Sequence, residues 1–203
     1  MDLSDARKQP HADSSYFPPG LPKAEVYSQV LEQAKALVDG QRNWIDHIRS
    51  NFANVSSLLW HAFAALPAPS SSVNWAGFYV RKDKFPSPPS AQQDTNAKVP
   101  STKILLLGPF QGKPACQFIY FGRGVCGTSA EKRETVLVDD VLNWEGHIAC
   151  DADSRSEIVV PILVDRETVA IIDIDCTEPS GFDDVDKKGL EALASLMAEC
   201  CDW

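Results

Sequence analysis

Three cysteines occupy glycine-rich or loop-like stretches of the chain and could carry thiol chemistry. Cys116 closes the segment LGPFQGKPAC at 107–116, Cys126 lies in GRGVCG at 122–127, and Cys150 lies in HIACD at 147–151. A thiolate can attack a substrate, and a second thiol within reach can convert the product into a disulfide. This layout is therefore compatible with redox chemistry.

A buried core position and a zinc site both compete with a redox role for these cysteines. Free cysteine is among the residue types most often buried, which would make any one of the three a core residue. A zinc site is less well supported, because the close Cys-x-x-Cys pairs of structural sites are missing, and only His147 and Cys150 are near neighbours. We therefore expect no metal site.

The remaining three of the six cysteines are expected to be structural. Cys176 alternates onto the same strand face as Ile172 and Ile174, which indicates a buried position. Cys200 and Cys201 lie near the C-terminus, where we expect a frayed helix end.

Acidic residues form a second candidate group. In Asp173-Ile174-Asp175 the two-residue period of a strand puts both carboxylates on one face, about 7 Å apart. Glu157 heads the neighbouring predicted strand, so the three acids could converge on one pocket. Burial and like charge would raise the pKa of at least one acid and make it a proton donor, while the others could hold an ammonium group. Pairing of these acids with Arg155 or with lysines is equally consistent with the sequence.

Three further features are weaker signals. Gly122-Arg123-Gly124 precedes a short predicted helix and resembles an anion-holding turn, although such glycines also serve tight turns. Trp75 could line an apolar pocket, and His147 could act as a base. An aromatic residue on a strand is more often part of the core, and a lone histidine more often a loop residue.

The apolar periodicity predicts the elements that would position these residues. We expect helices at 24–38, 44–63 and 183–200, the first ended by Gly40 and the last with Val185, Leu190, Leu193 and Met197 inward. Strands are expected at 73–80, 103–107, 115–120, 135–138, 157–164 and 168–175. A glycine-rich loop is expected at 108–113. Residues 1–23 are expected to be a flexible arm, and 81–102 a loop inserted at a hairpin tip. The pattern indicates an α+β fold, with helices packed against a mostly antiparallel sheet.

Bulk properties exclude several function classes. The 28 acidic residues outnumber the 19 basic ones, and the resulting charge of -9 opposes binding of nucleic acid. The sequence contains no run of 18 apolar residues, so no segment is predicted to span a membrane. Six cysteines without a secretory signal favour a reducing compartment, the cytoplasm or the nucleus.

Taken together, these motifs resemble the free methionine-(R)-sulfoxide reductase family, whose members are GAF-domain enzymes. The resemblance is carried by segments 74–79, 107–116, 122–127, 146–151, 156–158 and 173–175. It covers the chain from about Ala24 to the C-terminus and implies a single GAF domain over 24–203. The implied fold is a central, mostly antiparallel six-stranded sheet with helices on both sides. The arm and the 81–102 insertion depart from the compact family pattern.

The resemblance also implies an activity. The substrate would be free methionine-R-sulfoxide and the reductant thioredoxin, with no metal or organic cofactor. A homodimer is compatible with a GAF domain. Cys150 matches the attacking thiol, Cys116 its resolving partner and Cys126 a further exchanging thiol, although the division between Cys126 and Cys150 stays open. The acids Glu157, Asp173 and Asp175 match those around the sulfoxide and the ammonium group, and Trp75 matches the wall at the methyl-thioether end. A non-catalytic GAF module that binds a small ligand, or a redox sensor, is the alternative.

Overall fold

The structure is a computed structural model that describes residues 17–39, 44–85, 99–147 and 151–203, with only the backbone described for 44–50. Gly40, Cys150, most of the predicted arm and most of the predicted insertion lie outside the described residues. At the end of the predicted arm, Phe17 is buried in the main core, and Lys23 already begins the first helix.

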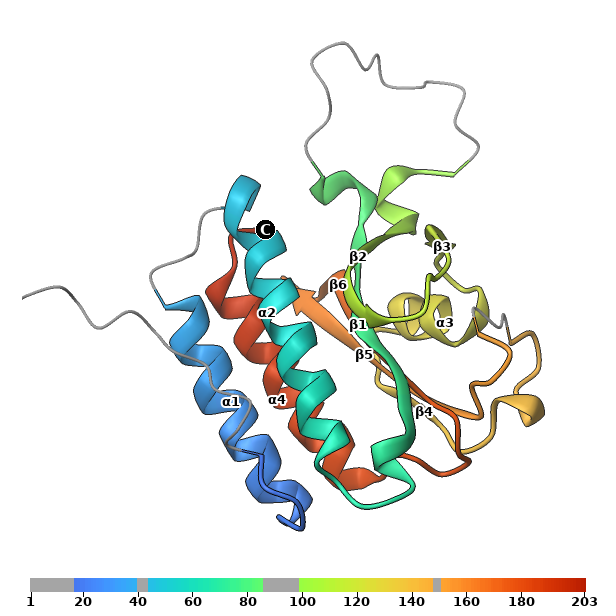
Figure 1. Ribbon diagram of the computed structural model, residues 1–203. Coiled ribbons are helices and arrows are strands. Elements are labelled where there is room, and N and C mark those ends of the chain that lie inside the picture. Colours follow the sequence, from blue (N-terminus) through green and yellow to red (C-terminus); the bar gives the residue numbers. More distant parts are fainter. Residues whose placement is uncertain (1–16, 40–43, 86–98, 148–150) are drawn as a thin grey trace, which may run out of the picture.

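The centre of the fold is one six-stranded sheet in which all neighbouring strands are antiparallel (Figure 1). Its strands are β1 (Val73–Arg81), β2 (Ile104–Gly112), β3 (Phe118–Tyr120), β4 (Val136–Val138), β5 (Ser156–Val164) and β6 (Glu167–Cys176), in the order β3-β2-β1-β6-β5-β4. Strands β1, β6 and β5 therefore lie side by side in the middle of the sheet, although β1 is far from the other two in sequence.

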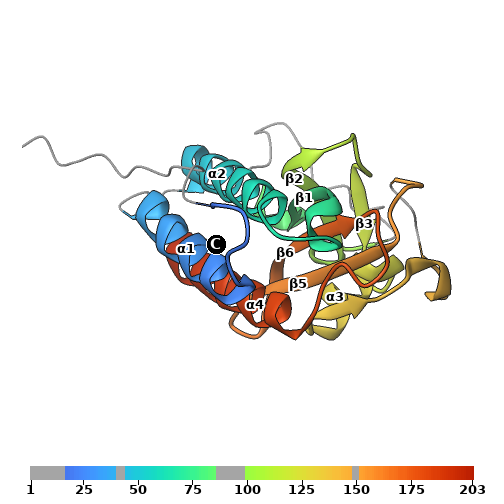
Figure 2. The same cartoon turned by 60° about the horizontal axis from the view of Figure 1, so that its bottom comes forward.

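Helices cover both faces of this sheet, as predicted. They are α1 (Lys23–Val38), α2 (Trp44–Ala64), α3 (Gly124–Lys132) and α4 (Asp184–Cys200). Helices α2 and α4 pack on one face with α1 against them, and α3 packs on β5 and β6 from the opposite face (Figures 1 and 2). The Asp183 side chain caps α4 by accepting from the backbone N–H groups of Val185 and Asp186.

Side-chain alternation along β1 divides the apolar residues into two clusters. Ala76, Phe78 and Val80 join the main core beneath α2 and α4. Trp75 and Tyr79 belong to a smaller cluster on the side of α3. The expected two-residue period of this strand is confirmed, and it places Trp75 on the same side of the sheet as the first turn of α3.

Several local predictions were wrong. The strand predicted at 115–120 is shortened to β3 at 118–120, which leaves Cys116 in the loop before it. Strand β2 continues through the expected glycine-rich loop to Gly112, because residues 110–112 pair with β1. Val185, which was expected to point inward, is 40% exposed, and Asp186 takes the inward position. Val185 lies five residues before Leu190, and at 100° per residue this puts the two side chains about 140° apart around the helix axis. Cys201 is only 3% exposed, because the chain after α4 folds back onto the core, where the Trp203 ring lies 5.8 Å from the Phe52 ring.

Among the residues that the structure describes, no helix is both long enough and apolar enough to cross a membrane.

Candidate active site

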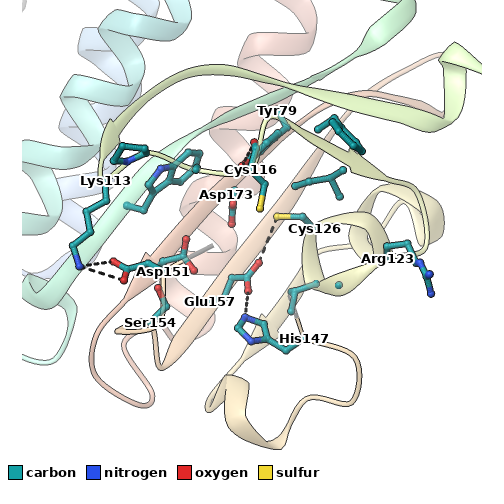
Figure 3. Close-up of a pocket in the computed structure, with 18 of the residues that line it drawn as sticks. Tyr79, Lys113, Cys116, Arg123, Cys126, His147, Asp151, Ser154, Glu157 and Asp173 are labelled. Atoms are coloured by element: carbon teal, nitrogen blue, oxygen red, sulfur yellow. Dashed lines mark hydrogen bonds and ion pairs between the residues drawn. The ribbon is translucent and has the colours of Figure 1, made fainter. Parts of the chain in front are cut away.

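A cavity of about 310 Å³ opens on the α3 side of the sheet and collects nearly all the predicted site residues (Figure 3). Its lining includes Trp75 from β1, Cys116 from the β2–β3 loop, Cys126 from α3, His147, Glu157 from β5, and Asp173 and Asp175 from β6. Cys150 lies outside the described residues, but Asp151, which follows it in the sequence, lines the cavity.

Strand register brings the three acids together. Glu157 and Asp175 are direct partners in the β5–β6 pair, and Asp173 lies on the same face of β6, two residues before Asp175. Glu157 and Asp173 are about 5% and 6% exposed, and Asp175 is half-buried. The predicted convergence of three acids on one pocket is therefore what the structure contains.

Burial governs the protonation of two of these acids. The pKa of Asp173 lies well above its usual range because the carboxyl is buried and because Glu157 lies beside it. Burial, followed by the charges of Asp173 and Glu157, likewise raises the pKa of Asp175. Within the described part of the chain, Asp173 Oδ1 has no hydrogen-bond partner. The pocket thus offers carboxylic acids that can donate a proton and an unused acceptor for a cation.

The Cys126 thiol lies among these acids. Its Sγ donates a hydrogen bond to Glu157 Oε1 at 3.5 Å, and the other Glu157 oxygen lies 3.6 Å from His147 Nε2. Burial, followed by the charges of Asp173 and Glu157, raises the pKa of this thiol well above its usual value. A thiol held in the protonated form is a weak nucleophile.

Glycines at the start of α3 bring Cys126 to this position. Gly122 and Gly124 have positive φ angles of 77° and 61°, which glycine adopts without strain. A Cβ on Gly127 would lie 2.2 Å from the Tyr120 carbonyl oxygen, so only glycine lets the helix approach β3 this closely.

The predicted anion-holding turn at 122–124 is largely occupied by the protein itself. The backbone N–H groups of Gly122 and Arg123 donate to the carbonyls of Gly127 and Tyr120. Figure 3 shows the Arg123 side chain directed away from the thiols and acids.

Cys116 reaches the cavity from a different segment and is half-buried. The Tyr79 hydroxyl donates to the Cys116 carbonyl at 3.0 Å and anchors this segment to β1. Figure 3 shows the sulfur atoms of Cys116 and Cys126 directed towards the same part of the cavity as Asp173. The tertiary structure therefore places two thiols and the acids in one site.

One subset of these residues has the donor atoms of a metal site. The ligand atoms of Cys126, Glu157 and Asp173 all lie within 4.8 Å of one another. The sequence spacing gives no sign of this group because its members come from α3, β5 and β6. An ammonium group would satisfy the same oxygen atoms, so the geometry does not require a metal.

A polar network at the mouth of the cavity was missed by sequence reasoning. Asp151 accepts from Asn74 Nδ2 at 3.0 Å and from Lys113 Nζ at 3.0–3.2 Å, and Asn74 also donates to Ser154 Oγ at 3.1 Å. The only signal was that Asn74, Lys113 and Asp151 each stand beside or within a motif already noted.

The chain is similar in sequence and fold to known proteins. The family model described as "GAF domain" matches residues 53–200, which defines the chain as a GAF-domain protein. The free methionine-R-sulfoxide reductase of Saccharomyces cerevisiae is 47% identical over 94% of this chain and 94% of its own length. The enzyme of the same name from Escherichia coli is 37% identical over 86% of this chain and 88% of its own.

A solved structure supports the same relationship. The X-ray structure of free methionine-R-sulfoxide reductase from Neisseria meningitidis, in complex with its substrate, has a TM-score of 0.71 and 34% identity, over 90% of this chain and 92% of that one. The chain belongs to the free methionine-R-sulfoxide reductase family of GAF-domain proteins.

Proposed function

We propose that this protein reduces free L-methionine-(R)-sulfoxide to L-methionine by thiol chemistry. The observation that carries the proposal is a cavity in which the thiols of Cys116 and Cys126 face the acids Glu157, Asp173 and Asp175. The family relationship supports the same substrate, because the relatives described above carry the name of this activity.

The cavity fits the two ends of the proposed substrate. The Trp75 ring stacks on the rings of Tyr79 and Phe110, at 5.7 and 5.2 Å between centroids, and offers an apolar wall to the methyl-thioether end. Asp173 and Asp175 offer carboxyl oxygens to the ammonium group and a proton to the sulfoxide oxygen. A methionine sulfoxide residue within a peptide has no free ammonium group, which is why we propose restriction to the free amino acid.

The proposed reaction begins with a thiolate that attacks the sulfoxide sulfur. An acid with a raised pKa protonates the oxygen, methionine leaves, and the oxygen is retained on the cysteine as a sulfenic acid. A second thiol displaces that oxygen as water and forms a disulfide, which an external dithiol of the thioredoxin class then reduces. The chemistry requires no metal or organic cofactor.

The protonated state of Cys126 bears on the roles of the three thiols. A buried thiol donating to Glu157 is poorly suited to attack. We therefore assign attack to Cys150, as the family resemblance implies, and resolution to Cys116. Cys126 stays available for exchange once a disulfide has formed nearby.

The test is an assay with dithiothreitol and each sulfoxide epimer of free methionine, followed by quantification of methionine. We expect turnover of the R epimer alone, and little activity on N-acetylated methionine sulfoxide. Replacement of Cys150 by serine should abolish turnover, whereas the serine variant of Cys176, a buried thiol outside the cavity, should retain it. Binding of the R epimer without turnover would instead indicate a non-catalytic ligand-binding module and would refute the proposal.

A further inference from the structure

Lys113 joins the two segments of the chain that carry the proposed reacting thiols. Its Nζ lies 3.0 Å from Asp151 Oδ2, as Figure 3 shows, and 2.7 Å from Asp153 Oδ2. Lys113 precedes Cys116 by three residues, and Asp151 follows Cys150 directly. One side chain therefore bridges the β2–β3 loop and the loop before β5.

Asp151 is a largely buried carboxylate that other groups besides Lys113 also hold in place. Its side chain is only 14% exposed. Besides Lys113, it accepts from Asn74 Nδ2 at 3.0 Å and from the backbone N–H of Asp153 at 3.1 Å. These bonds, that of the Asp153 N–H foremost and that of Lys113 next, hold the pKa of Asp151 below its usual value. The carboxylate is thus held in its charged form and fixed in place on β1 through Asn74.

The backbone before Lys113 is shaped to deliver it to Asp151. Gly112 has a φ of 124°, a conformation that favours glycine. A Cβ on Gly112 would also lie 2.5 Å from the Asn74 carbonyl oxygen and 2.9 Å from the Trp75 ring. The chain therefore turns tightly against the start of β1, beside the residue that holds Asp151.

We propose that Lys113 is a positioning residue for the disulfide-forming step, because its bridge to Asp151 holds the Cys116 segment against the segment that follows Cys150. The inference rests on the proposed function and on the assignment of Cys150 and Cys116 as the reacting pair. Lys113 takes no part in the bond changes and acts through the placement of Cys116.

The step concerned is the attack of the Cys116 thiolate on the sulfenic sulfur of Cys150. The new S–S bond forms as the S–O bond breaks, the oxygen leaves as water with two protons, and no further oxidant or reductant is needed. A disulfide requires Cα atoms about 4.4–6.8 Å apart, so the rate depends on how often the two segments are close. Loss of the bridge lets the Cys116 segment move away and lowers that frequency.

The experiment compares Lys113→Met, which keeps an unbranched side chain one atom shorter and removes the charge, with Lys113→Arg. Lys103→Met is the matched control, since Lys103 also forms an exposed ion pair, with Glu131 at 2.9 Å. Each reduced protein is mixed with free methionine-R-sulfoxide in the absence of reductant. Methionine formed in the first turnover is followed by rapid quenching. The sulfenic acid is trapped with a dimedone reagent, and the disulfide is mapped by mass spectrometry.

We expect Lys113→Met to slow formation of the Cys116–Cys150 disulfide about two- to five-fold, the range that the loss of a partly exposed ion pair supports. Trapped sulfenic acid should rise accordingly, while methionine formation slows far less. Lys113→Arg should restore the rate, and Lys103→Met should match the wild type. Disulfide formation at the wild-type rate in Lys113→Met would overturn the inference, as would an equal loss in methionine formation, which would place Lys113 in substrate binding. Absence of methionine from the wild-type protein would instead refute the proposed function.

Discussion

Replacement of Asp173 by asparagine should make the protein more stable and less active at neutral pH. Asp173 is 6% exposed, faces Glu157 and leaves Oδ1 without a partner among the described residues. A buried polar group without a partner destabilises a protein by about 1–3 kcal/mol. An amide at this position carries no charge and can donate to Glu157, so we expect a gain of that order, or about 2–12 °C in Tm for a domain of this size.

The pH dependence of this gain has a defined sign. Because the pKa of Asp173 is raised in the folded protein, the protonated carboxyl stabilises the fold most at low pH. That contribution is lost as the pH rises from the unfolded pKa, about 3.9, through the higher folded value. The variant has no carboxyl at this position to titrate. The difference in free energy of unfolding between the variant and the wild type should therefore grow between about pH 4 and pH 7.5.

Urea unfolding followed by tryptophan fluorescence, at pH 4.5 and at pH 7.5, measures both quantities. Glu199→Gln, at an exposed position of α4, makes the same change in charge and should leave stability nearly unchanged. Turnover of methionine sulfoxide should fall at least ten-fold in Asp173→Asn. The reasoning would be refuted if the variant were no more stable than the wild type at pH 7.5, or if its advantage did not shrink in acid.

Two further predictions concern α3. Gly127→Ala should reduce the free energy of unfolding by about 1–3 kcal/mol, because the added methyl group would lie 2.2 Å from the Tyr120 carbonyl oxygen and the backbone must shift; a loss below about 0.5 kcal/mol in urea unfolding would contradict the close approach seen here. Iodoacetamide at pH 7 should label Cys126 more slowly than Cys116, since burial and the neighbouring acids raise the pKa of the Cys126 thiol. Peptide mapping by mass spectrometry measures both rates, and equal labelling would show that Cys126 is less protected than its burial indicates.

Much of the sheet could be predicted because strand periodicity is a local property. The alternation of residues 73–80 is visible in the sequence, and so are the two apolar strands joined by the polar turn at 165–167. The structure keeps both patterns, in β1 and in the β5–β6 pair. The end of β2 could not be predicted in this way, because its pairing with β1 outweighs the weak strand preference of Gly108, Pro109 and Gly112.

The candidate site contains some contacts that the local sequence pattern predicts and others that it does not. Asp173 and Asp175 share a strand face for a reason that their spacing alone supplies. Their meeting with Glu157 was expected from strand adjacency, and the register of β5 against β6 made it specific. No spacing in the sequence indicated that Asp151 would accept hydrogen bonds from both Asn74 and Lys113, because those bonds join segments about 40 to 80 residues apart.

The sequence by itself determined the chemical groups of this protein and the strand faces on which they lie, because residue type and two-residue alternation are written locally. The tertiary structure decided how those groups behave. It buried the Cys126 thiol among carboxyls, which raises the pKa of the thiol, and it left Asp173 Oδ1 without a partner among the described residues. The first property depends on desolvation and on charges brought from other elements, and the second on which groups the fold places beside the carboxyl; a linear pattern contains neither.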